Sequence, residues 1–132
     1  LIDRLADEYF IVQLGKQNEV QLDKVVRFAG KLDLRESIAV LEKCCLFIGG
    51  VSFLMHAAVA VDVKSVIIYG GRETPQNSGY ENNINLYQNI DCGPCWIHEE
   101  DGENCMNAKI CMKHIDVKKV NEAVISLLNN AK

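Results

Sequence analysis

Four closely spaced cysteines constrain the fold of this chain more than any other feature. They are Cys92, Cys95, Cys105 and Cys111, and their spacing is C-x2-C-x9-C-x5-C. Gly93 and Pro94 separate the first pair and allow a tight turn, so that two thiolates can approach one ion. Four thiolates make a closed tetrahedral site, which suits zinc or a single iron and leaves no position for a substrate. The spacing predicts a structural metal site on the loop 92–111, with two disulfides or four unrelated thiols as the alternatives.

The cysteines also bear on the cellular compartment. The loop 96–104 carries four carboxylates, so it needs a clip to pack against a domain. Cys44 and Cys45 lie in an apolar run, where free thiols behave as small hydrophobic residues. Free thiols together with a thiolate site favour a reducing cytoplasm over an oxidising compartment. His98 and His114 could each replace a sulfur ligand, but the complete set of four cysteines makes them ordinary surface residues.

Length and charge narrow the classes of protein further. With 132 residues, the chain is long enough for one domain with a hydrophobic core. Its net charge of −4, without any Lys/Arg cluster, argues against a nucleic-acid surface. The nearly apolar stretch 51–61 is far shorter than the about 20 residues of a transmembrane helix, so no membrane span is expected. Because the chain starts at Leu1 without an initiator methionine or a signal peptide, we expect a piece of a longer protein.

Short apolar runs alternate with helical patterns along the chain. Strands are expected at 9–14, 25–28, 46–49, 65–69 and, after a polar loop at 72–83, at 85–90. Helices are expected after the caps Asp33, Ser52 and Asp116. The buried stripes would be Leu34, Ile38, Leu41 and Cys45 in the first helix and Val117, Val120, Val124 and Leu127 in the last. Repeated β–α units with continuously apolar strands predict an α/β fold, a parallel sheet with helices on both faces.

A glycine pair marks the junction between the strand at 46–49 and the next helix. Gly49 and Gly50 end the strand, and Ser52, Phe53, Leu54 and His56 follow within the first helical turns. Ligands of open α/β sheets bind at this edge, and the free N–H groups of a helix amino terminus favour phosphate. The Ser52 hydroxyl and the next two amides could therefore hold a diphosphate, with His56 one turn further along. A simple strand–helix turn with a buried histidine is the alternative interpretation.

Several of these segments together resemble the heptosyltransferase family of glycosyltransferases. The segments are 48–58, 66–75, the four cysteines and the terminal helix. The cysteine spacing and the sequence Gly-Gly-Arg-Glu at 70–73 are most similar to the bacterial autotransporter heptosyltransferases. The resemblance implies a GT-B arrangement, in which two Rossmann-like domains face across a cleft and the C-terminal domain holds the nucleotide sugar. Residues 1–132 would then be an N-terminally truncated, C-terminal nucleotide-sugar-binding domain.

The resemblance also implies an activity. The full enzyme would transfer heptose from ADP-heptose to serine hydroxyls of an autotransporter adhesin. The donor-binding residues would be Gly49, Gly50, Ser52, Phe53, Leu54, His56 and Arg72. The four cysteines would bind one structural iron per chain, with zinc as the alternative metal, and the subunits would form a homo-oligomer. The catalytic base belongs to the N-terminal domain, so this chain should hold no catalytic residue and should be inactive alone.

Two other functions stay open. A lipopolysaccharide core heptosyltransferase would use the same donor on a lipid-linked sugar. A non-catalytic, metal-stapled assembly module is the second alternative, because Val51-Ser52-Phe53 stands where the family usually has Asp-Ser/Thr-Gly. In the second case the donor site would be lost and the metal site would remain.

Overall fold

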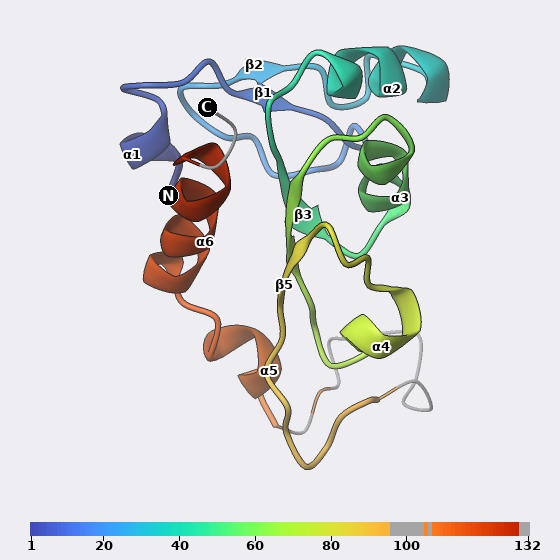
Figure 1. Cartoon of the computed structure of the whole chain (residues 1–132), viewed down its shortest axis with the longest axis vertical. Coiled ribbons are helices and arrows are strands. Elements are labelled where there is room, and N and C mark those ends of the chain that lie inside the picture. The colour runs from blue at the N-terminus through green and yellow to red at the C-terminus, as the bar shows by residue number, and fades with distance from the viewer. Residues whose placement is uncertain (96–104, 106, 130–132) are drawn as a thin grey trace.

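Parallel strands form the framework of the chain (Figure 1). The computed structural model describes residues 1–95, 105 and 107–129. Strand β1 (Val12–Gln13) pairs with β2 (Val26–Arg27), and β3 (Phe47–Gly50), β4 (Ser65–Ile68) and β5 (Ile84–Leu86) form a second sheet in the order β3-β4-β5. Every neighbouring pair is parallel, which confirms the predicted strand direction. The strands divide between two hydrogen-bonded sheets, whereas the sequence predicted a single sheet.

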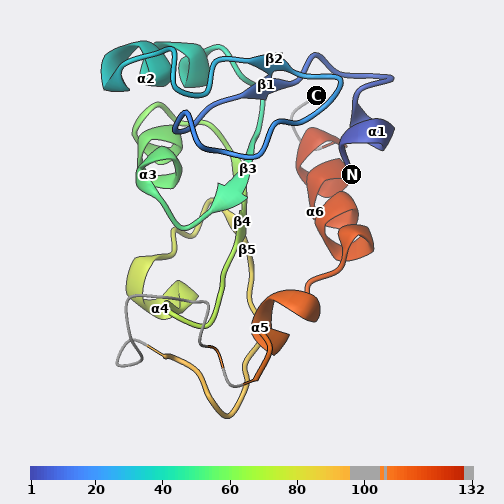
Figure 2. The same cartoon turned by 180° about the vertical axis from the view of Figure 1, so that it is seen from behind.

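Helices cover the larger sheet on both faces. The helices are α1 (Ile2–Leu5), α2 (Leu34–Glu42), α3 (Phe53–Ala60), α4 (Pro75–Ser78), α5 (Ile110–Lys113) and α6 (Val117–Asn129). Figures 1 and 2 show α3 on one side of the β3–β5 sheet and α6 on the other, with α4 and α5 together at one end of the strands. This arrangement confirms the α/β fold with two covered faces.

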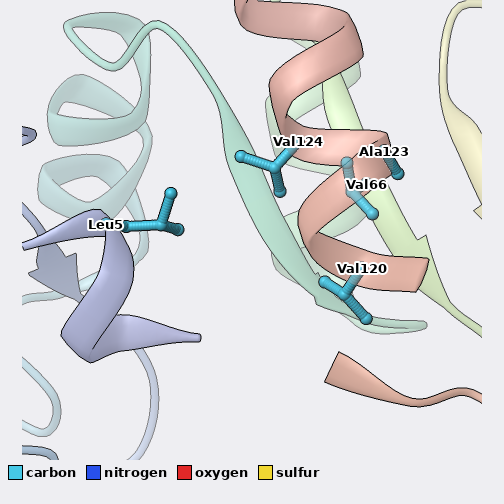
Figure 3. Close-up of a cluster of buried hydrophobic side chains, with 5 residues drawn as sticks. All are labelled: Leu5, Val66, Val120, Ala123 and Val124. Carbon is cyan, nitrogen blue, oxygen red and sulfur yellow. The ribbon is translucent and has the colours of Figure 1, made fainter. Parts of the chain in front are cut away.

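Strand β4 explains how the two faces are filled. Side chains alternate across a strand, so successive residues of β4 enter opposite layers. Val66 packs with Leu5, Val120, Ala123 and Val124, the cluster that Figure 3 shows between α1, β4 and α6. Ile67 and Tyr69 pack on the other face against Met55 of α3. Val66, Ile67 and the following Tyr69 are fully buried, which makes this strand the centre of the core.

Two of the predicted helix caps have the expected geometry. Asp33 accepts a hydrogen bond from the Glu36 amide at 2.8 Å, and the Glu36 carboxylate accepts one from the Asp33 amide at 2.8 Å. This reciprocal pair is a capping box, which satisfies two amides that α2 itself leaves unpaired. Asp116 Oδ1 accepts from the Lys119 amide at 2.8 Å and starts α6 in the same way.

The buried helix stripes are narrower than predicted. Leu41 is 2% exposed and Val120 and Val124 are buried, but Leu34 is 63% exposed and Val117 is 50% exposed. Leu34 and Val117 are the first residues of their helices, of which α2 packs against α3 and α6 packs against β4. Cys45 is also exposed, because α2 ends at Glu42. The prediction that these three side chains point inward was wrong.

The predicted loop at 72–83 contains a short helix. Thr74 precedes α4, and Pro75 occupies its first turn, where the fixed φ of proline suits a helix and its missing N–H costs nothing. The predicted strand at 85–90 is β5 at Ile84–Leu86, and the strand predicted at 9–14 is reduced to β1. Among the described residues, no helix is long and apolar enough to cross a membrane.

Candidate functional site

The predicted donor residues lie at one edge of the larger sheet. Gly50, the last residue of β3, is paired in register with Ile68, the last residue of β4. The carboxyl ends of the two strands therefore meet at the same edge, and the turns 51–52 and 70–74 leave from it. This is the edge at which open α/β sheets bind ligands.

Steric contact excludes a side chain at Gly49 but not at Gly50. A Cβ at Gly49 would lie 2.5 Å from the far atom of the Phe47 ring, so the ring folds over the strand only because no side chain is present. At Gly50 the nearest atom to a Cβ would be the Ile68 carbonyl oxygen at 3.7 Å, which is ordinary contact. Gly49 shapes the strand end, and Gly50 is exposed beside the start of α3.

The amino terminus of α3 presents polar groups at this edge. Ser52 is the N-cap residue, as predicted, but its side chain makes no capping hydrogen bond. Phe53 and Leu54 are the first two helical residues, whose amides have no partner within the helix. Phe53 is 46% exposed, so the helix start is open to solvent. A hydroxyl that caps nothing and two leading amides form a cradle that suits a phosphate group.

His56 lies one helical turn after Ser52 and does not enter the core. It is exposed, so the alternative interpretation of a buried core histidine is wrong. Its Nδ1 lies 2.8 Å from the Tyr80 hydroxyl, and the two rings meet edge to face with centroids 5.7 Å apart and planes at 76°. Tyr80 was not predicted as a site residue, because the contact joins residues far apart along the chain. Arg72, the other predicted donor residue, is exposed in the turn after β4.

The structure brings two of the four predicted metal ligands together. A Cβ on Gly71 would lie 3.3 Å from Cys95 Sγ and 3.4 Å from Cys111 Sγ, so both sulfurs adjoin the same point. The Cys95 amide donates to the Gly71 carbonyl oxygen at 2.6 Å, which ties the cysteine segment to the end of β4. Gly71 is thus a glycine because two sulfurs fill the space of its side chain.

Among the described residues, the other two cysteines, Cys92 and Cys105, do not join this pair in a group placed to hold a metal ion. Cys105 Sγ accepts a hydrogen bond from the Lys109 amide at 3.3 Å, and backbone N–H groups of Lys109 and Asn107 lower the pKa of this thiol. A lowered pKa favours the thiolate, which is the form that binds a metal. Cys92 is exposed three residues before Cys95. The described residues contain no group of three or more His, Cys, Asp or Glu side chains placed to hold a metal ion.

The four cysteine thiols have the chemistry of metal ligands, and the structure places two of them, Cys95 and Cys111, next to each other. All six cysteines are described, and none of them forms a disulfide. Cys95 and Cys111 are adjacent across Gly71, and Cys105 has the N–H···S contact that stabilises a thiolate. Residues 96–104 and 106 of the predicted metal loop, His98 included, lie outside the described residues. The next residue after Gly71 is Arg72, so the cysteine pair adjoins the candidate donor edge.

A cavity of about 340 Å³ lies away from this edge. Its walls include Val59, Asp62, Lys64 and Asn83, which precede β4 and β5 or end α3. These residues belong to the amino-terminal end of the strands, where open α/β sheets do not bind their ligands.

The chain is similar to known glycosyltransferases in sequence and in fold. The model of glycosyltransferase family 9 (heptosyltransferase) matches residues 11–106. The crystal structure of the bacterial iron-containing dodecameric glycosyltransferase TibC from enterotoxigenic E. coli H10407 matches 99% of the chain with a TM-score of 0.81 at 22% identity. A second structure, of dodecameric iron-containing heptosyltransferase TibC in complex with ADP-D-beta-D-heptose, matches 99% of the chain with a TM-score of 0.80 at 22% identity. No curated protein matches the chain significantly.

These matches differ in what they establish. The chain spans 39% of the length of both TibC chains, and at this identity the likeness to them shows a shared fold. The family model covers most of the chain, including β1 to β5, the start of α3 and three of the four clustered cysteines. The chain therefore belongs to glycosyltransferase family 9, the heptosyltransferase family.

Proposed function

We propose that this chain is the donor-binding part of a glycosyltransferase that moves heptose from ADP-heptose to serine hydroxyls of an autotransporter adhesin. Family membership supports heptosyl transfer, and the solved TibC complex supports ADP-heptose as the donor. The observation that carries the proposal is the amino terminus of α3 at the carboxyl edge of the sheet, with an uncommitted Ser52 hydroxyl and exposed leading residues.

The donor site would act on the leaving group of the reaction. In transfer, a bond forms between the serine oxygen and C1 of heptose, and the bond from C1 to the diphosphate oxygen breaks. The serine proton passes to a base in the remainder of the enzyme, and ADP leaves with the bonding electrons. Negative charge then grows on the diphosphate, which the amides of Phe53 and Leu54 and the cation of Arg72 would stabilise. The side chains of Ser52 and His56 would orient it.

The four cysteines would hold one structural metal ion. We propose iron, because TibC contains iron, with zinc as the alternative that thiolate chemistry equally allows. Cys95 and Cys111 supply the pair that already adjoins Gly71, and Cys92 and Cys105 complete the set. Such an ion would add folding free energy by holding the loop 92–111 to the end of β4.

The assembly around this chain follows the same argument. The remainder of the enzyme would be an acceptor-binding N-terminal domain that carries the catalytic base, so residues 1–132 alone should not catalyse transfer. TibC is dodecameric, which supports a homo-oligomer. We expect the enzyme to act in the cytoplasm, where free thiols such as Cys44 and Cys45 persist.

A transfer assay tests the activity. The full-length protein is incubated with ADP-heptose and either an autotransporter passenger domain or a lipid-linked core saccharide, and mass spectrometry follows each acceptor. We expect the acceptor to gain heptose residues on serine, with one ADP released per transfer. If heptose passes only to a lipid-linked core saccharide, the acceptor proposal is wrong. If the protein neither binds ADP-heptose nor consumes it with either acceptor, the proposed activity itself fails.

A further inference from the structure

Tyr80 has a place in the donor site that the sequence did not indicate. We propose that Tyr80 is a positioning residue, whose hydroxyl holds the His56 ring so that its Nε2–H points to the donor diphosphate. The proposal deepens the function proposed above and rests on it for the identity of the ligand. Its structural basis is the contact between the Tyr80 hydroxyl and His56 Nδ1, 2.8 Å long.

The contact fixes the His56 ring in two ways. The hydrogen bond sets the position of Nδ1, and the edge-to-face meeting of the rings at 76° sets the ring plane. An exposed histidine without such partners would turn among several rotamers. Ordering the ring in advance removes that entropy cost from ligand binding.

We assign the Tyr80 hydroxyl as the donor of this hydrogen bond, and that direction sets the tautomer of His56. A tyrosine hydroxyl carries one proton and can donate it to an imidazole nitrogen that has none. When the Tyr80 hydroxyl donates to Nδ1, the proton of neutral His56 is on Nε2. Nε2–H is then a hydrogen-bond donor, as a phosphate oxygen requires. Without the hydroxyl, both tautomers are populated, and only one of them suits the anion.

Backbone hydrogen bonds and side-chain packing both fix the position of Tyr80 beside α3. Its carbonyl oxygen accepts from the Asn83 amide at 3.1 Å and from Asn85 Nδ2 at 3.3 Å, which ties the turn to β5. Its side chain packs against the buried cluster of Met55, Ile67 and Tyr69. The hydroxyl is therefore placed by the sheet and the helix together.

Gly79 makes this placement possible. Its amide donates to the Pro75 carbonyl oxygen at 2.8 Å, which closes the turn after α4 directly before Tyr80. A Cβ at Gly79 would collide with the same Pro75 oxygen, so any side chain there would push the turn away. The segment from α4 to Asn85 therefore places the side chain of Tyr80 beside His56.

His56 lies where a ligand at the helix start could meet it. Ser52 and His56 are four residues apart, so they share one face of the helix start. Tyr80 occupies Nδ1, and within the described part of the chain Nε2 has no hydrogen-bond partner. Nε2 is the ring nitrogen left for the ligand.

The test compares Tyr80→Phe with Tyr87→Phe in the full-length protein. Both tyrosines pack against the Met55, Ile67 and Tyr69 cluster, but Tyr87 meets Tyr69 edge to face and has no contact with His56. We expect the affinity for ADP-heptose, measured by isothermal titration, to fall about tenfold in Tyr80→Phe and less than about twofold in Tyr87→Phe. Gly79→Ala keeps the hydroxyl but displaces it, and it should lower the affinity as Tyr80→Phe does.

A double-mutant cycle shows whether Tyr80 acts through His56. Adding Tyr80→Phe to a His56→Ala protein should cause no further loss of affinity, because the residue to be positioned is gone. A full tenfold further loss in that background overturns the proposal. Unchanged affinity in Tyr80→Phe overturns it as well.

A spectroscopic readout separates this inference from the proposed function. Nitrogen NMR of histidine-labelled protein reports the tautomer of His56 without any ligand. We expect the proton on Nε2 in the parent and in Tyr87→Phe, and a mixture of tautomers in Tyr80→Phe. A parent with the proton on Nδ1, or a Tyr80→Phe protein with the parent's tautomer, contradicts the positioning role. If the parent does not bind ADP-heptose but the tautomer responds as expected, the donor assignment fails and the hydrogen bond remains.

Discussion

At the scale of single residues, the neighbouring thiols Cys44 and Cys45 have different surroundings. Cys44 is partly buried behind α2, its Sγ donates to the Val40 carbonyl oxygen at 3.3 Å, and burial raises its pKa. Cys45 is exposed. A raised pKa means a smaller thiolate fraction at any pH below it, and the thiolate is the form that reacts.

Alkylation should therefore distinguish the two residues. With iodoacetamide at about pH 8, we expect Cys45 to be modified several times faster than Cys44, as followed by fragment-resolved mass spectrometry. Unfolding the protein should remove the difference, because the burial of Cys44 is lost. Equal rates in the folded protein would show that Cys44 is not shielded.

At the scale of secondary-structure elements, the three helices of eight or more residues, α2, α3 and α6, each begin after a polar residue, but only two of these side chains bond to their helix. Asp33 caps α2 and Asp116 caps α6, whereas the Ser52 hydroxyl caps nothing. A capping bond is worth about 1 kcal/mol, so its absence at Ser52 leaves the hydroxyl available to a ligand.

Substituting Asp33 and Ser52 in turn tests how much each N-cap residue contributes to stability. Asp33→Ala should lower the free energy of unfolding by about 1 kcal/mol, because it removes the side-chain oxygen that accepts the hydrogen bond of the Glu36 amide. Ser52→Ala should change it by less than about 0.5 kcal/mol. Urea denaturation of the two variants measures the difference. An equal loss in both would mean that Ser52 supports the helix and is not reserved for the donor.

The sequence predicted those elements whose signals are local. The buried strand β4, the capping box at Asp33 and the α6 stripe from Val120 follow from apolar spacing and cap residues near in sequence. Helix α4 was missed because its residues are polar and only Pro75 marks it. Which strands share a sheet was also missed, because hydrogen-bond partners between strands are set by the tertiary structure.

The candidate site divides in the same way. Gly49, Gly50 and Ser52 could be predicted, because the strand–helix junction is continuous in sequence. Tyr80 and the packing of Gly71 against two sulfurs could not be predicted, because both depend on how separate elements fold together. The exposure of Leu34 and Val117 was missed for a related reason, since helical spacing does not show which turn of a helix first contacts the element it packs against.

At the scale of the whole molecule, the cysteine pair and the donor edge meet at the end of β4. Gly71 adjoins the sulfurs of Cys95 and Cys111, and Arg72 follows it directly. Met112 of α5 lies against the neighbouring Gly70, with its sulfur 3.4 Å from the place of a Cβ. A metal ion at the cysteines would thus secure the same turn that presents Arg72.

Metal content and stability test this link. Elemental analysis of the full-length protein should give about one iron or zinc per chain, and Cys111→Ser should lose most of it. The midpoint of thermal unfolding should fall on the order of 5 °C in that variant, because an incomplete site no longer holds the loop. Cys45→Ser is the matched control, since Cys45 is exposed and lies outside the cluster. A Cys111→Ser protein that keeps its metal and melts like the control contradicts the cysteine site.

Donor binding at the start of α3 is the central claim, and isothermal titration of the full-length protein with ADP-heptose tests it most directly. We predict saturable binding in the parent and an affinity about fivefold to tenfold lower in Ser52→Ala, at unchanged stability, since one hydrogen bond to a charged group is lost. No detectable heat at millimolar ADP-heptose, or equal affinity in the parent and in Ser52→Ala, would contradict the donor site assigned to this edge of the sheet.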